Sequence, residues 1–98
     1  MHMADEENKD RAIITVLGAD RAGIVAAVAG TLSDCSANIL DISQTILQGI
    51  FTMTMLVDLS DSTVDFATLK SSLDQLSERL GVQITIQREE VFKFMYRL

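Results

Sequence analysis

The sequence predicts an α+β fold in which two amphipathic helices cover one face of a four-stranded antiparallel sheet. Runs of alternating apolar residues, typical of strands, flank two stretches whose apolar residues recur at helical spacing. These segments follow the order β-α-β-β-α-β, with a further short helical stretch after the last strand. Two neighbouring strands are joined by only two residues, so they must pair as an antiparallel hairpin. Right-handed crossovers then give the sheet order 4-1-3-2.

Composition indicates one globular domain. The chain has 98 residues, of which 48% are hydrophobic and 22% are charged. Residues 1–10 hold four acids and show no periodicity, so we expect a disordered acidic tail before a single domain over residues 11–98. The N-terminus is acidic where a signal peptide would be basic and then apolar, and we therefore expect a cytoplasmic protein.

Charge and residue content exclude several classes of partner and site. With a net charge of −6, the chain lacks the clustered basic residues of a nucleic-acid-binding protein and the polybasic patch of a membrane-binding one. No apolar run is long enough to cross a bilayer. The chain has one Cys and one His, which lies in the tail, so we expect no disulfide, no metal site and no cofactor.

A strand over Arg11–Leu17 opens the domain and leads into the turn Gly18–Gly23. We expect the first helix over Arg21–Cys35, with Asp20 as its N-cap. The N–H groups and the dipole at the start of a helix favour an anion. Arg21 in the first turn opposes that dipole, and its presence is easier to explain when an anion binds there.

The central hairpin is predicted by its turn and by its residue pattern. Strands over Asn38–Leu47 and Ile50–Asp58 flank the pair Gln48-Gly49, which is typical of a two-residue hairpin turn. The turn fixes the register and places one apolar side of the hairpin in the core. The expected pairs are Leu47 with Ile50, Ile46 with Phe51, Gln44 with Met53, Ile42 with Met55 and Leu40 with Val57.

The remaining elements follow from helical stripes and from residues typical of helix ends. The first helix has a stripe that ends at Cys35, whose thiol we expect to be buried and unreactive. The second helix begins near Phe66, after the capping-box spacing Ser62–Asp65, and ends before Gly81. A strand over residues 82–88 and a docked terminal helix over residues 89–98 complete the chain.

Several motifs resemble those of the ACT domain, which has the ferredoxin-like βαββαβ fold. They are the segments Ile14–Val25, Asn38–Thr45 and Phe51–Met53. The ending Val91–Leu98 is similar to that of a family of small stand-alone ACT proteins of unassigned function. At the same motifs the chain resembles the glycine cleavage regulator and the N-terminal part of formyltetrahydrofolate deformylase.

This resemblance implies a regulatory module that binds a small molecule, most often an amino acid. It also implies a homodimer or higher oligomer, since ACT domains commonly pair side by side through sheet edges, with the ligand close to the partner chain. Ser36 stands where the family usually has Gly, so the turn before the second strand can differ. Carried over to this chain, the ligand-binding residues are Ala19, Asp20, Arg21, Ala22, Gly23, Asn38 and Ile39.

Two other functional classes remain alternatives to ligand sensing. A protein–protein interaction or oligomerisation module would pair through sheet edges and the open face without binding a ligand. An enzyme on the same topology is disfavoured: Arg21 and Asn38 superficially resemble a pair in acylphosphatases, but the chain lacks their phosphate-loop motif. We therefore expect no catalytic residues.

Overall fold

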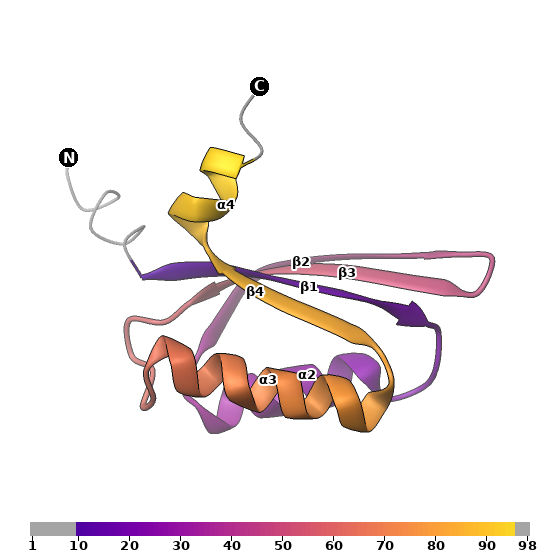
Figure 1. Ribbon diagram of the computed structural model, residues 1–98, viewed down its shortest axis with the longest axis horizontal. Helices are drawn as coiled ribbons and strands as arrows, with labels where there is room; N and C mark the ends of the chain where they lie inside the picture. The colour runs from indigo at the N-terminus through magenta and orange to yellow at the C-terminus, as the bar shows by residue number, and fades with distance from the viewer. Residues whose placement is uncertain (1–9, 96–98) are drawn as a thin grey trace.

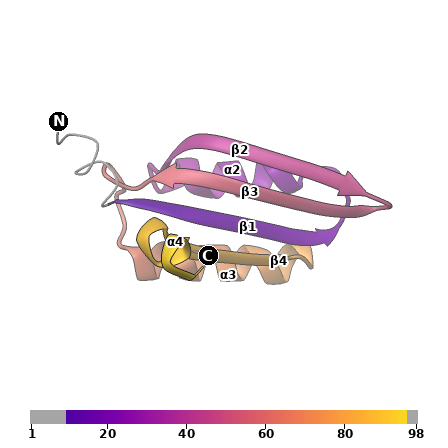
Figure 2. The same ribbon diagram turned by 90° about the horizontal axis from the view of Figure 1, so that it is seen from above.

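The computed structural model describes residues 10–95, which form a four-stranded antiparallel sheet with helices on both faces (Figures 1 and 2). The sheet order is β2-β3-β1-β4, which is the predicted order read from the other edge. The helices α2 and α3 cover one face, called here the inner face, and α4 lies on the opposite, outer face (Figure 1). The elements are β1 (Arg11–Ala19), α2 (Ile24–Asp34), β2 (Asn38–Leu47), β3 (Ile50–Asp58), α3 (Phe66–Leu80), β4 (Gln83–Arg88) and α4 (Glu89–Met95).

The core lies between the inner face of the sheet and the two helices. The inward side chains of β1, β3 and β4 meet the buried stripes of α2 and α3. The expected stripe of the first helix is confirmed as far as Cys35, which is 7% exposed. The least exposed large side chains of this core are Ile14, Val16, Ile24, Val28, Leu32, Met53, Met55, Val57, Leu69, Leu73 and Leu76.

The hairpin is confirmed, apart from one register error near its open end. Gln48 and Gly49 both have positive φ, at 51° and 83°, as a type I′ turn requires. The register holds from Leu47 opposite Ile50 down to Ile42 opposite Met55. A β-bulge then places Ile39 opposite Val57, so the predicted pairing of Leu40 with Val57 is wrong. A bulge adds one unpaired residue to a strand, and alternation alone does not reveal it.

The apolar inner side of β2 is not part of the core, contrary to expectation. Ile39, Leu40, Ile42 and Ile46 are between 39% and 58% exposed. Residues opposite them on β3, such as Met55 and Val57, are fully buried. The alternation pattern fixes which side of a strand faces inward, but it does not fix how far a helix extends over the edge.

The N-caps of both long helices differ from the prediction, although α3 begins at Phe66 as expected. The N-cap of α2 is Gly23, with φ 91°, and no side chain caps the helix. Asp20 is therefore not the cap, and Arg21 precedes the helix instead of lying in its first turn. The N-cap of α3 is Asp65, whose carboxylate accepts a 2.8 Å hydrogen bond from the Thr68 N–H, so the capping box from Ser62 is wrong. Gly81 ends α3 with φ 71°, as predicted.

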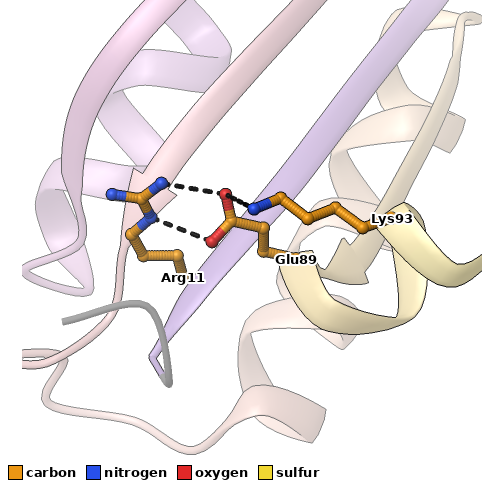
Figure 3. A network of polar contacts seen from close by, with 3 residues as sticks. All are labelled: Arg11, Glu89 and Lys93. Carbon is orange, nitrogen blue, oxygen red and sulfur yellow. Dashed lines mark hydrogen bonds and ion pairs between the residues drawn. The ribbon is translucent and has the colours of Figure 1, made fainter. Parts of the chain in front are cut away.

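A partly buried ion pair fixes α4 to the sheet (Figure 3). Arg11, at the start of β1, donates two hydrogen bonds of 3.0 and 2.9 Å to the carboxylate of Glu89. Lys93, one turn along α4, lies 3.7 Å from the same carboxylate. The bonds from Arg11 lower the pKa of Glu89, although burial opposes them. The predicted end of this helix, and residues 1–9 of the predicted tail, lie outside the described residues.

Candidate functional site

The turn Ala19–Gly23 is attached to two other loops at the same end of the sheet. The N–H of Asp20 donates a 2.8 Å hydrogen bond to the carbonyl oxygen of Gly49, in the β2–β3 turn. The Nη1 of Arg21 donates a 2.9 Å hydrogen bond to the carbonyl oxygen of Leu80, the last residue of α3. A guanidinium has five N–H donors in a fixed geometry, so Arg21 retains the capacity to bind a carboxylate.

The start of α2 has the features of an anion-binding site, and no side chain of the described residues caps it. The first N–H groups of a helix have no intrahelical partner, and no side chain caps those of α2. The space around the Gly23 α-carbon is open, so a small molecule can approach the backbone there. Asp20, Arg21 and Ala22 are all exposed around this position.

The other predicted residues, Asn38 and Ile39, line a hollow of about 360 Å³ at the opposite end of α2. The hollow lies at the C-terminal end of the helix, where carbonyl groups favour a cation. Ser36 at its rim has φ 59°, the left-handed conformation that the replaced family Gly would adopt freely. The full lining is Ala29, Ser33, Ser36, Ala37, Asn38, Ile39 and Asp61.

Within one chain the two halves of the predicted site are far apart. Ala19 lies opposite Ile50 beside the hairpin turn, whereas Asn38 lies opposite Asp58 at the other end of β3. The eight residue steps between Ile50 and Asp58 correspond to roughly 26 Å of strand. The structure therefore brings Ala19 to Gly23 together in one place and Asn38 with Ile39 in another.

The sequence reasoning missed the polar side chains that surround Asn38. Ser33 lies on the last turn of α2, and Asp61 comes from the loop after β3. Only Ser36 had a sequence signal, because it stands where the resembling family has Gly. Asp61 had none, since its place beside α2 depends on how the β3–α3 loop crosses the end of the sheet.

Residues 10–95 contain neither a cluster of metal-ligating side chains nor a membrane-spanning helix. No group of three or more His, Cys, Asp or Glu side chains in this part of the chain lies close enough to hold a metal ion. None of its helices has the length and apolar content to cross a membrane.

Comparison with known proteins identifies the family. The family model described as "ACT domain" matches residues 10–87. A UPF0237 protein of Methanocaldococcus jannaschii is 52% identical over 88 residues, which cover 90% of this chain and 98% of that protein. The solved ACT domain protein from Streptococcus pneumoniae is 43% identical, with a TM-score of 0.74, over 85% of this chain and 93% of that one.

The regulators and enzymes that the motifs resemble are also structural neighbours. A putative glycine cleavage system transcriptional repressor is 26% identical, with a TM-score of 0.71, over 80% of this chain and 44% of the repressor. Formyltetrahydrofolate deformylases share the fold as well. The matched length, the identity to uncharacterised relatives of the same size and the shared βαββαβ topology agree. The chain belongs to the ACT domain family, among its small UPF0237 members.

Proposed function

We propose that this protein is a regulatory module that binds an amino acid between two copies of the chain joined along β2. ACT domains are commonly small-molecule-sensing regulatory modules. The observation that supports the interface is the position of the two half-sites, one at each end of a domain whose edge strand is exposed and apolar. The proposed module has no catalytic role, and hydrolysis of an acyl phosphate by the pure protein would overturn that part.

The β2 edge has the properties of a pairing surface. An edge strand presents unpaired N–H and C=O groups, and an edge of ten residues, five of them apolar, is prone to pair with another strand. Ile42 and Ile46 on its inner side are about half exposed, so pairing would also bury apolar area. Association along β2 would extend the four-stranded sheet to a continuous sheet across both copies.

Antiparallel pairing of two β2 strands would bring the half-sites together. The strand starts at Asn38, beside the hollow, and ends near the turn Ala19–Gly23. A two-fold axis through its centre sets the start of one β2 beside the end of the other. The N–H groups of the turn and Arg21 of one copy would then bind the ligand carboxylate. Asn38 and Asp61 in the hollow of the other copy would bind its ammonium group.

One observation favours the alternative of an interaction module without a ligand. Arg21 already donates to the carbonyl oxygen of Leu80 and helps hold the α3–β4 corner. A residue used in this way has a structural reason to be present whether or not a ligand binds. The alternative predicts the same β2 pairing but no saturable response to small molecules.

Light scattering and a thermal-shift screen separate these outcomes. We expect wild type at low micromolar concentration to have at least twice the chain mass of 10.8 kDa. Ile42→Lys should remove the β2 pairing, because it places a charge on the apolar edge, whereas Gln83→Lys on the opposite edge should not. Wild type that is monomeric at these concentrations would contradict the proposed interface.

The ligand is tested with all common amino acids at millimolar concentration. A ligand at 100 times its dissociation constant stabilises the native state by about 2.7 kcal/mol, which raises Tm by roughly 10 °C or more for a domain of this size. Asp61→Asn and Asn38→Ala should each reduce that shift, whereas the exposed control Asp74→Asn on α3 should not. A dimer that none of these compounds stabilises would favour the interaction module.

A further inference from the structure

Exposed apolar side chains outside the β2 edge gather on the outer face of the sheet. Ten large apolar residues are exposed in the described part of the chain, and four of them are the β2 residues named above. Strand alternation and the position of α4 place the other six on the outer face (Figure 1). They are Leu17, Leu47, Ile50, Val91, Phe94 and Met95, which are between 40% and 72% exposed.

These six residues form two groups near opposite ends of the face. Leu17, Leu47 and Ile50 lie near the β2–β3 turn and are called here the tip group; Leu47 is directly opposite Ile50. Val91 and Met95 lie one turn apart on α4, which stands over the first part of β1 and the last part of β4 (Figures 1 and 2). Beside α4 is a recess of about 230 Å³ lined by Ile13, Thr15, Thr85, Gln87, Phe92 and Met95.

The base of α4 is fixed to the sheet by an ion pair, and part of the apolar side of the helix stays exposed. Glu89, the first residue of the helix, is 5% exposed and takes two hydrogen bonds from Arg11. This bidentate pair sets the position of the helix base, since paired N–H donors fix both distance and angle. Among the residues that the structure describes, none covers Val91 or Met95, which are 40% and 53% exposed.

Uncharged side chains fill the sheet between the two groups. The chain has 14 acids and a net charge of −6, so like charges on two copies repel one another overall. The middle of the outer face is an exception, with small polar side chains that neither repel a second copy nor require a counter-charge. They are Thr15, Thr45, Thr52, Thr54 and Thr85.

We propose that the outer face is a self-association surface, in which α4 of one copy covers the tip group of a second. A two-fold axis lying across the strands exchanges the two ends of the face. It therefore places α4 of each copy over the tip group of the other, so the same contact forms twice. This surface lies on the outer face, and of its exposed apolar residues it shares only Leu47, at the end of β2, with the proposed edge interface; the inference does not depend on ligand binding.

The area of the outer face is large enough for a weak association, which the proposed dimer along β2 would strengthen. Four strands about 4.8 Å apart and nine residues of about 3.3 Å each give a face of roughly 600 Å² per copy. Two such faces bury roughly 1,200 Å², at the lower end of the size range of specific interfaces. Two copies already joined along β2 would offer about twice that area.

Sedimentation of charge variants tests the surface. We expect wild type to form tetramers as its concentration rises, and Leu17→Glu or Val91→Glu to weaken that step by about tenfold or more. Ser71→Glu, on the exposed side of α3, adds the same charge elsewhere and should leave it unchanged. Ile42→Lys should still pair through the outer face, which separates this surface from the β2 interface. Equal association of wild type, Leu17→Glu and Val91→Glu would overturn the proposal.

Cross-linking tests the same contact without relying on stability. Leu17→Cys and Met95→Cys proteins, when mixed under oxidising conditions, should form a mixed disulfide faster than either protein mixed with Ser71→Cys. The native thiol of Cys35 is buried, which keeps the background low. Mixed disulfides that form no faster than the Ser71→Cys control would refute the contact between α4 and the tip group.

Discussion

The guanidinium of Arg21 donates a hydrogen bond to the carbonyl oxygen of Leu80, so a residue before one helix caps the end of another. The last carbonyl groups of a helix are unpaired and carry partial negative charge, which a cation stabilises. From the sequence, the presence of Arg21 at this turn is explained by an anion that binds there. The structure offers a partner within the chain, and the ligand role of Arg21 remains a proposal.

Replacing Arg21 should therefore affect stability a little and ligand binding more. We expect Arg21→Ala to lower the free energy of unfolding by about 0.5–1 kcal/mol, since an exposed hydrogen bond to a carbonyl contributes modestly. Arg21→Lys should recover part of this, because an ammonium also interacts with a helix C-terminus. Urea unfolding measures the change. A loss of several kcal/mol would mean that the bond to Leu80 organises much more of the fold than its exposure indicates.

Gly18 is required by its contact with Val82. A Cβ atom added at Gly18 would lie 2.6 Å from Val82 Cγ1, which forces β1 and β4 to shift. We expect Gly18→Ala to destabilise the domain by about 1–3 kcal/mol. The double variant with Val82→Ala should lose less than the sum of the two single changes, by about 0.5 kcal/mol or more. Gly30→Ala, a helix position with no neighbour within 4 Å, should instead stabilise by up to about 1 kcal/mol.

The pair between Arg11 and Glu89 makes stability depend on acid pH. The folded-state pKa of Glu89 lies below its ordinary value of 4.5, so its contribution is present above that value and is lost as pH falls through the folded pKa. Glu89→Gln should cost about 1–3 kcal/mol at neutral pH and make the acid-side decline less steep. Some decline will remain, because hydrogen bonds also lower the pKa of Asp58 and Asp65.

Unfolding curves from neutral to acid pH measure this effect. Asp74→Asn is the control, since it removes an ion pair with Lys70 whose side chains are both more than half exposed. If the free energies of unfolding of Glu89→Gln and wild type differ by the same amount at every pH, the contacts of Glu89 do not lower its pKa in the folded protein. Hydrogen exchange should show faster opening of α4 in Glu89→Gln.

Ser36 holds a left-handed conformation with φ 59°, which strains any residue with a Cβ atom. Ser36→Gly should relieve about 1–2 kcal/mol of strain but lose about 0.5–1 kcal/mol through the greater freedom of the unfolded chain, for a small net gain. Gly23→Ala is the reciprocal change, because it introduces a Cβ atom at φ 91° in otherwise open space. Thermal unfolding should show Tm rising for the first and falling for the second.

Elements with local signals could be predicted from the sequence. The hairpin followed from Gln48-Gly49 and alternating residues, and the end of α3 followed from Gly81. The bulge at Leu40 and the cap at Gly23 could not be predicted, because both depend on where the chain meets neighbouring elements. The same holds for the exposure of β2, which depends on how far α2 reaches across the sheet.

The sequence predicts which residues form the candidate site but not how they are arranged in space. The resemblance named the turn Ala19–Gly23 and the strand start at Asn38, and each lies in a place open to a small molecule. Their separation along the sheet follows from the direction and length of the strands, which the matching of motifs did not take into account. The contribution of Asp61 requires knowledge of the β3–α3 loop path, a tertiary feature with no local sequence signal.

The two edges of the sheet are unequal, and this inequality limits how the protein can polymerise. The β2 edge has ten residues, five of them apolar and exposed, whereas β4 has only six residues, and its two apolar ones are buried. Head-to-tail stacking of sheets into a fibril needs two compatible edges on each subunit. If β2 pairs with its own copy as proposed, that pairing uses up the longer edge and leaves only the two short β4 edges exposed. The inequality of the edges would then disfavour amyloid-like extension along the hydrogen-bonding direction.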